Sequence, residues 1–216
     1  MLAELMLLMA SCAPDVSPVT LQALVQHESS TNAYAIGINS STRLKEQPQD
    51  AASAQKVVKG LLEKGVDFDA GLGQINVRNW AWLGLDEQSV FDPCMNLKAA
   101  QTVLADCYAR ALKQFNDEQQ ALQAALSCYN TGNFEKGFAN GYVSKVLAQA
   151  GIKVPALKAP QSSKKQKQPA RQERRGNDGF NRSKAVDGFK QPSEQSIQSQ
   201  SQSTSKAPIT LFPSDS

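Results

Sequence analysis

The sequence of 216 residues lacks the features of several large protein classes. It contains no run of about 20 apolar residues, so we expect no helix that spans a membrane. A single histidine and the absence of any Cys-x-x-Cys pair argue against a zinc site, and we expect neither a metal nor another cofactor. Strand-like alternation of apolar and polar residues is scarce, whereas helical periodicity recurs. The sequence therefore predicts a mainly α protein.

Apolar periodicity is confined to the first part of the chain. Residues 1–152 carry 11 Lys and Arg against 15 Asp and Glu, a net charge of −4, whereas residues 153–216 carry 12 against 5, a net charge of +7. The second segment is rich in Ser, Gln and Pro, with too few apolar residues to offset the entropy lost on folding. We therefore predict one folded domain at 1–152 and a basic, disordered tail at 153–216.

The positive charge of the tail is interleaved with Ser and Gln, and few aromatic residues are present there to stack on bases. We therefore do not expect nucleic acid as a partner of this chain. A short linear motif that binds another protein is an alternative role for the tail.

The first residues fit two interpretations. Leu2, Leu5, Met6 and Met9 recur with helical spacing, which indicates the first helix of the domain. The same apolar stretch could instead serve as an export signal. That signal normally carries Lys or Arg near its start, where this chain has Glu4.

The four cysteines permit three fully paired connectivities. If a helix begins near Asn96, Cys107 lies about 16 Å along its axis, so a bond from Cys94 to Cys107 would need a broken helix. A bond from Cys12 to Cys94 or to Cys107 is the better alternative. The other interpretation is that all four cysteines, Cys128 included, are buried and stay reduced.

Five further helices are expected in the domain, separated by loops at 31–50, 65–95 and 129–139. Their predicted starts are Pro18 after the cap Ser17, Ala51, the cap Asn96, the cap Asp117 and the cap Asn140, with Gly65 and Gly151 closing the second and the last.

The helix that begins at Pro18 contains an unusual residue on its apolar stripe. Leu21, Leu24 and Val25 occupy positions i, i+3 and i+4, and the next position of the stripe is Glu28. A wrong helical register, a buried structural carboxylate and a catalytic acid all remain possible explanations. Burial raises the pKa of a carboxyl, which is what a proton donor at neutral pH requires.

Four ordered motifs decide between these explanations. Glu28-Ser29, "GLGQIN" at 71–76, "LSCYNTGN" at 126–133 and "YVSKV" at 142–146 together resemble the lytic transglycosylase family, whose domains have a lysozyme-like α fold. The resemblance covers about residues 12–150. With "CAPDVSPVTLQALVQHES", "FDPC" and "ADCY", the chain is most similar to the peptidoglycan-cleaving subunit of type IV secretion and conjugation systems.

The resemblance implies cleavage of the β-1,4 bond between N-acetylmuramic acid and N-acetylglucosamine. In this family the residue at the position of Glu28 first protonates the glycosidic oxygen. It then takes the proton of the muramoyl 6-hydroxyl, which closes a 1,6-anhydro ring. The N-acetyl group of the substrate replaces the second carboxylate that most glycosidases use.

The resemblance also implies the residues that bind the substrate. Ser29 would fix the Glu28 carboxyl or orient the sugar, and Tyr142 would close the groove near Glu28. The turn formed by Gly71, Leu72 and Gly73 would bring the backbone close to the glycan. The remaining assignments place Gln74 and Ile75 against the sugar, Tyr129 near the carboxylate and Asn130 on an acetamido group.

Two departures from the family pattern carry expectations of their own. The family often has Met or Ala where this chain has Gly73, which predicts a looser groove wall there. It commonly has Ala at the position of Cys128, which argues against a disulfide at that residue.

Neighbouring residues have less certain roles. Trp80 and Trp82 could stack on sugars or belong to the core, and we interpret His27 as a surface residue or a neighbour of the site. If Asp67 or Asp69 faced Glu28 across the cleft, it could position a water and make the enzyme a hydrolase similar to goose-type lysozyme.

The sequence therefore predicts a periplasmic lytic transglycosylase that opens the cell wall for a type IV secretion or conjugation apparatus, although the export signal is unclear. Its expected partners are peptidoglycan glycan strands and, through the tail, subunits of the secretion system. A wall-binding assembly factor that holds glycan without cutting it is the alternative.

Overall fold

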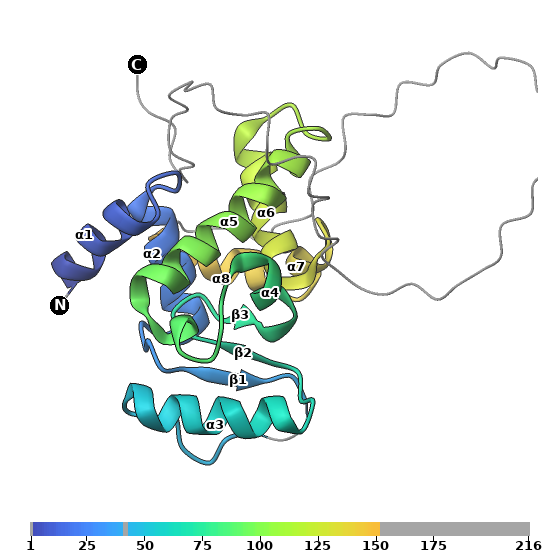
Figure 1. The fold of residues 1–216 in the computed structure, drawn as a ribbon. Helices are drawn as coiled ribbons and strands as arrows, with labels where there is room; N and C mark the ends of the chain where they lie inside the picture. The colour runs from blue at the N-terminus through green and yellow to red at the C-terminus, as the bar shows by residue number, and fades with distance from the viewer. Residues whose placement is uncertain (1, 41–42, 152–216) are drawn as a thin grey trace, which may run out of the picture.

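The computed structural model describes residues 2–40 and 43–151, coloured in Figure 1. The tail at 153–216, for which the sequence predicts disorder, lies outside the described residues. Helices dominate, and a small antiparallel sheet lies between helix α3 and the other helices (Figure 1). The prediction of a mainly α protein is confirmed.

The order of elements follows the chain closely. The helices are α1 (Leu2–Cys12), α2 (Pro18–Ser29), α3 (Ala51–Glu63), α4 (Trp80–Leu83), α5 (Pro93–Ala111), α6 (Glu118–Thr131), α7 (Lys136–Ala139) and α8 (Tyr142–Gln149), with 3₁₀ turns η1 (Val77–Asn79) and η2 (Ser89–Phe91). The strands are β1 (Ile36–Ile38), β2 (Phe68–Ala70) and β3 (Ile75–Asn76). They form an antiparallel sheet in the order β1-β2-β3, in which Ile36 pairs with Ala70, and Ala70 with Ile75.

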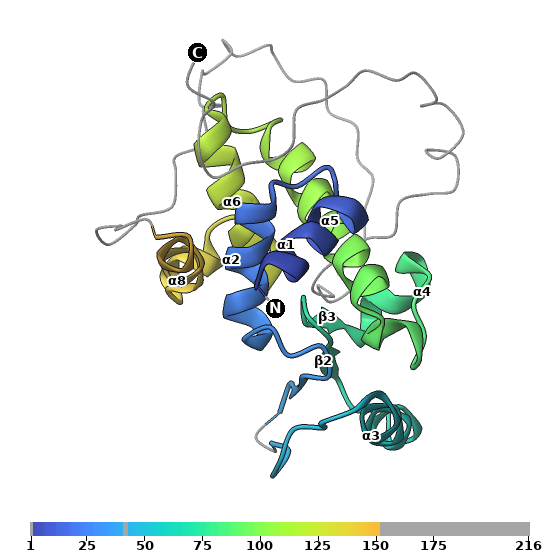
Figure 2. The same ribbon diagram turned by 90° about the vertical axis from the view of Figure 1, so that its left-hand side faces the viewer.

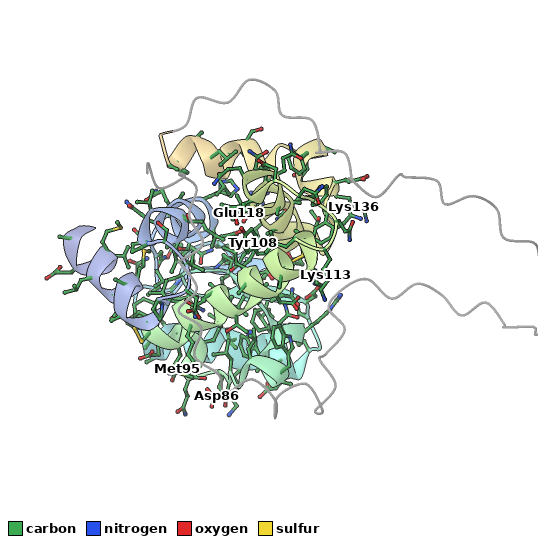
Figure 3. The ribbon with its side chains drawn as sticks, turned by 90° about the horizontal axis from the view of Figure 1, so that it is seen from above. Asp86, Met95, Tyr108, Lys113, Glu118 and Lys136 are labelled. Atoms are coloured by element: carbon green, nitrogen blue, oxygen red, sulfur yellow. A yellow bond between two sulfur atoms is a disulfide. The ribbon has the colours of Figure 1, made fainter. Side chains whose placement is uncertain are left out.

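The core lies between α2, α5, α6 and α8. Leu21, Leu24 and Val25 of α2 are fully buried, as their helical spacing predicts. Figure 2 shows α2 between α8 and α1. Seen from above, α5 and α6 lie side by side, with Tyr108 of α5 near Glu118 of α6 (Figure 3). The apolar faces of α2, α5, α6 and α8 are buried against one another.

Helix α1 confirms the interpretation of the first residues as a helix of the domain. Met9 is fully buried in the core, and Leu5 and Met6 pack against it. Leu7, on the opposite face, is 74% exposed. Among the described residues, no helix is both long and apolar enough to span a bilayer.

The cysteines form two disulfides, Cys12–Cys94 and Cys107–Cys128, so the interpretation as four buried thiols is wrong. The bond from Cys12 to Cys94 is one of the two alternatives that the spacing favoured. The argument against a disulfide at Cys128 is also wrong, because α6 lies alongside α5 and brings the Cα atoms of Cys107 and Cys128 to 5.9 Å from each other. That contact belongs to the tertiary structure and leaves no mark on local sequence.

The predicted starts of α2, α3 and α6 are confirmed, although the Ser17 side chain makes no capping hydrogen bond. The expectation that Asn96 caps a helix is wrong. Helix α5 begins three residues earlier, because Asp92 accepts a hydrogen bond from the Met95 amide and Pro93 occupies the first turn.

Two further differences concern the last helix and the loops. Gly141, rather than Asn140, is the capping residue of α8, while the Asn140 side chain accepts a hydrogen bond from the Tyr142 amide. The segments expected to be loops contain the three strands, which have only two or three residues each and are too short for a clear alternation of apolar and polar residues.

Candidate active site

Glu28 lies in the last turn of α2, at the point where the helix stops abruptly. Ser30 and Thr31, which follow the helix, have φ angles of 52° and 65° in the left-handed region. Among the described residues, one other non-glycine residue has a positive φ, namely Gln74, at 48°. Residues with side chains rarely adopt this conformation, and such backbone strain is often found at functional sites.

A cavity of about 520 Å³ opens beside Glu28 and collects residues from distant parts of the chain. Its lining residues come from α2, β2, β3, η1, α5 and α6, and from the residues next to β1, β3 and α6. They are Glu28, Asn39, Asp69, Gln74, Ile75, Asn76, Arg78, Asn79, Val103, Tyr129, Asn130, Thr131 and Gly132. Five of the residues predicted to cleave or bind the glycan therefore meet around one cavity, namely Glu28, Gln74, Ile75, Tyr129 and Asn130.

The Glu28 carboxyl is held by Tyr142. The Tyr142 hydroxyl donates a hydrogen bond to Glu28 Oε1, and the Tyr142 ring is almost fully buried. Burial raises the pKa of Glu28 to about 7, the Tyr142 hydrogen bond opposes that rise, and the negative charge of Asp69 adds to it. Glu28 therefore has the proton affinity of a general acid that operates near neutral pH.

His27 supports this arrangement from the side. Its ring meets the Tyr142 ring edge-on, with 5.0 Å between the ring centroids. Burial and the charge of Lys145 lower the pKa of His27, which favours its neutral form. His27 is thus a neighbour of the site, in contact with the residue that orients Glu28.

Tyr129 connects α6 with the turn of residues 71–74. Its hydroxyl donates a hydrogen bond of 2.7 Å to the Gly73 carbonyl oxygen. Burial, together with the charges of Glu28 and Asp69, raises the pKa of Tyr129 well above its ordinary value. The phenol therefore stays neutral and keeps its proton for this bond.

The 71–74 turn is tightly packed, so the expectation of a looser wall at Gly73 is wrong. A Cβ atom on Gly73 would lie 2.8 Å from Ala100 Cβ and 2.9 Å from Tyr129 Oη. Leu72 is 2% exposed and belongs to the core. Gly71, Leu72 and Gly73 do not line the cavity; they place Gln74 and Ile75, which do.

The side chains of Gln74 and Ser29 bind backbone. Gln74 Nε2 donates to the carbonyl oxygens of Ala35 and Gly71, which ties the turn to the segment before β1. Ser29 Oγ donates to the Val25 carbonyl oxygen, one turn back in α2. Ser29 thus forms a hydrogen bond within its own helix, as helical serines frequently do.

Asn130 is exposed at the rim of the cavity. Its Oδ1 accepts a hydrogen bond from Asn140 Nδ2, so the amide NH₂ is the group that Asn130 can turn toward a ligand. An amide donor suits the carbonyl oxygen of an acetamido group.

A second carboxyl, that of Asp69 on β2, lines the same cavity as Glu28. Asn76 Nδ2 donates to Asp69 Oδ1 at 2.8 Å and to Asp67 Oδ1 at 2.9 Å. Burial raises the pKa of Asp69, and its hydrogen bonds with Asn76 and Asn39 oppose the rise. Asp67 instead forms an ion pair with Arg78. Of the two aspartates considered from the sequence, only Asp69 shares the cavity with Glu28.

Four polar residues of the cavity lining outside α6 are absent from the candidates named from the sequence. Asn39, Asn76, Arg78 and Asn79 all line the cavity. Three of them follow Ile75 within four residues. The polar residues after "GLGQ" could therefore have been named as candidates from the sequence. The tryptophans do not line the cavity: Trp80 is buried against Phe68, and Trp82 Nε1 donates to Asn79 Oδ1.

Within residues 2–40 and 43–151, no three His, Cys, Asp or Glu side chains gather as a metal site requires.

The family model described as the Transglycosylase SLT domain matches residues 6–150. The chain belongs to the SLT transglycosylase family. This match confirms the resemblance seen in the motifs and the expectation of a lysozyme-like α fold. No solved structure matches this SLT transglycosylase significantly.

The chain is similar to two proteins that are named virB1. The chain is 42% identical over 153 residues to the "Type IV secretion system protein virB1" of Brucella abortus biovar 1, covering 68% of this chain and 64% of the relative. It is 43% identical over 148 residues to "Protein virB1" of Agrobacterium fabrum, covering 68% and 60%. The match thus spans less than two thirds of the length of each relative.

Proposed function

We propose that this chain is a peptidoglycan lytic transglycosylase that cleaves the bond between N-acetylmuramic acid and N-acetylglucosamine and leaves a 1,6-anhydro ring. The observation that carries the proposal is the Glu28 carboxyl, which lines a cavity, has a pKa of about 7 and is oriented by Tyr142. At neutral pH such a group carries a proton in roughly half of the molecules. Membership of the SLT family supports the same reaction.

The reaction uses Glu28 twice. The protonated carboxyl gives its proton to the glycosidic oxygen while the bond from that oxygen to the anomeric carbon breaks. The resulting carboxylate then takes the proton of the muramoyl 6-hydroxyl, whose oxygen bonds to the anomeric carbon. Glu28 ends protonated and no water is consumed, so one residue with a pKa near the working pH serves both steps.

The surrounding residues position the substrate for these steps. Tyr142 fixes one carboxyl oxygen of Glu28, which leaves the other for proton transfer. Ile75 offers an apolar wall, and the Asn130 amide offers a donor to an acetamido oxygen. Tyr129 binds the Gly73 carbonyl and thereby joins the two sides of the cavity.

Asp69 favours a second candidate function, that of a hydrolase similar to goose-type lysozyme. Its carboxylate lines the cavity that Glu28 lines and acts electrostatically on Glu28. In this alternative Asp69 would position a water that attacks the anomeric carbon, and the product would be a reducing sugar.

Digestion of purified sacculi in H₂¹⁸O separates the two reactions. The proposal predicts 1,6-anhydromuropeptides without ¹⁸O at the muramoyl end. Reducing muropeptides that carry ¹⁸O would assign the chain to the hydrolases. Binding to sacculi with no product of either kind would favour a wall-binding assembly factor.

We further propose that the enzyme acts on the periplasmic cell wall and opens it for a type IV secretion or conjugation apparatus. The two named relatives support this setting, since one is named a type IV secretion system protein. The basic segment 153–216 is the part that we propose docks to other subunits of the apparatus. Loss of binding to those subunits on deleting 153–216, with cleavage retained, is the expected result.

A further inference from the structure

Asn96 is a fully buried polar residue that does not line the cavity. It lies in the first turns of α5 and uses both ends of its amide. Its Oδ1 accepts a hydrogen bond of 2.7 Å from the Gly73 amide. Its Nδ2 donates to the carbonyl oxygens of Ala70 at 3.1 Å and Val90 at 2.8 Å.

These partners fix the orientation of the Asn96 amide. A backbone N–H can only donate, so it must face Oδ1, and carbonyl oxygens can only accept, so they must face Nδ2. A flipped amide would lose all three bonds. Asparagine is therefore well suited to this place, because it presents one acceptor and two donors from a short side chain.

Two of the three partners, Ala70 and Gly73, belong to segments that place residues in the cavity. Ala70 ends β2, the strand that carries Asp69, and Gly73 lies within the turn that places Gln74 and Ile75. The backbone of Gly73 is held at both of its polar groups, since its carbonyl oxygen accepts from Tyr129 and its amide donates to Asn96. One side chain of α5 thus ties the 71–74 turn to the helical core.

The backbone of the turn is fitted closely to this side chain. Gly71 has a φ of +81°, and a Cβ atom there would lie 2.1 Å from Asn96 Nδ2 and 2.6 Å from the Val90 carbonyl oxygen. A glycine at position 71 therefore serves the approach of Asn96 as well as the turn.

Asn96 projects from a well-anchored part of α5. The Asp92 side chain caps the helix, the Asn96 amide donates to the Asp92 carbonyl oxygen, and Cys94 is bonded to Cys12 of α1. A rigid base of this kind can define the position of a bound loop more closely than a loop can by itself.

We propose that Asn96 is a positioning residue of the glycan-cleaving site, which holds the 71–74 turn where Gln74 and Ile75 meet the sugar. The effect of Asn96 on activity rests on the proposed function, whereas its effect on the 71–74 turn rests on the structure alone. Asn96 touches no substrate itself and acts through the Gly73 peptide.

The test compares Asn96→Ala with Ser127→Ala. Ser127 is also fully buried, but its hydroxyl binds the Asn133 carbonyl and the Gly137 amide, in a different loop. Three readouts are needed: hydrogen exchange at the Gly73 amide, kcat/KM on soluble uncross-linked peptidoglycan strands, and the pH at which kcat/KM falls by half.

For Asn96→Ala we expect loss of exchange protection at Gly73 and a fall in kcat/KM of roughly tenfold or more, because a small misplacement of substrate contacts is costly in rate. The pH at half-activity should stay unchanged, since Glu28 and Tyr142 are not altered. Ser127→Ala should keep the protection and stay within about twofold of the wild-type rate, whatever stability it loses.

If Asn96→Ala does not fold, Asn96→Asp takes its place, because it keeps the shape and the acceptor for the Gly73 amide but loses donors to Ala70 and Val90. A reduced kcat/KM in folded Asn96→Asp would support the proposal. Unchanged protection at Gly73 in Asn96→Ala, or a rate of the folded Asn96 variant equal to that of Ser127→Ala, would overturn it. A wild type that releases no product would instead refute the proposed function, and the exchange measurement would still decide the role of Asn96.

Discussion

Tyr142 donates a hydrogen bond to the Glu28 carboxyl, although the two residues are 114 positions apart in the chain. The bond joins the first residue of α8 to the last turn of α2, two helices that pack against each other. It favours the ionised form of Glu28, whereas burial favours the protonated form more strongly. The pKa of about 7 is the balance of these effects.

Replacement of Tyr142 by Phe should raise the pKa of Glu28, because it removes a hydrogen bond to the ionised form and leaves the carboxyl buried. Activity that needs a protonated Glu28 falls as pH rises through that pKa. The alkaline limb of the kcat/KM profile should therefore move to higher pH in Tyr142→Phe. A limb that moves to lower pH would show that the bond has the opposite effect.

Replacement of Asp69 by Asn should lower the pKa of Glu28. Removing a nearby negative charge makes ionisation of Glu28 easier, so its pKa falls and the alkaline limb moves to lower pH. Asn76 can still bond to the new amide through its own rotation, so we expect the fold to survive. If Asp69→Asn abolishes cleavage at every pH, Asp69 takes part in the chemistry and the hydrolase alternative gains support.

Replacement of Glu28 by Gln should stabilise the protein at alkaline pH. The folded pKa of about 7 exceeds the ordinary value of 4.5, so the folded state binds more protons between these values and stability falls as pH rises. The neutral amide avoids that loss. Urea unfolding of Glu28→Gln at pH 8 should give a free energy of unfolding up to roughly 3 kcal/mol above wild type, with little difference near pH 4. An equal gain at both pH values would point to a packing effect instead.

Gly73 and Ala100 should be energetically coupled. A methyl group added at Gly73 meets Ala100 Cβ at 2.8 Å, and we expect Gly73→Ala to cost about 1–3 kcal/mol of stability. Ala100→Gly should cost about 1 kcal/mol in the middle of α5. The double variant should be more stable than the sum of the two losses predicts, although Tyr129 Oη, 2.9 Å from the added methyl, will keep the rescue partial. Strict additivity in thermal unfolding would show that the turn moves away from α5.

Local rules were enough to predict much of the helical frame. The stripe of Leu21, Leu24 and Val25 placed Glu28 on the inward side of α2, and Asp117 caps α6 as expected. These features depend on residues within one or two turns of each other. The roles assigned to Glu28, Ser29, Tyr129, Asn130 and Tyr142 in binding and catalysis stay predictions that the experiments above test.

The features that sequence reasoning missed depend on contacts between distant segments. Asn96 looks like a cap because asparagine favours caps, but its side chain serves a turn more than 20 residues earlier. Cys128 pairs with Cys107 only because α5 and α6 lie side by side. Asp69 was considered together with Asp67, and only the pairing of β2 with β3, strands too short to show a pattern, separates the two.

The central claim is that Glu28 supplies and then removes the proton in a cleavage that leaves an anhydro ring. The most direct test is to digest purified sacculi with wild type and with Glu28→Gln, and to quantify 1,6-anhydromuropeptides by mass spectrometry. Circular dichroism should first show that both proteins are folded. We predict abundant anhydro product from wild type and a loss of at least about a hundredfold in Glu28→Gln. Undiminished anhydro release by Glu28→Gln, or none from wild type, would contradict the account.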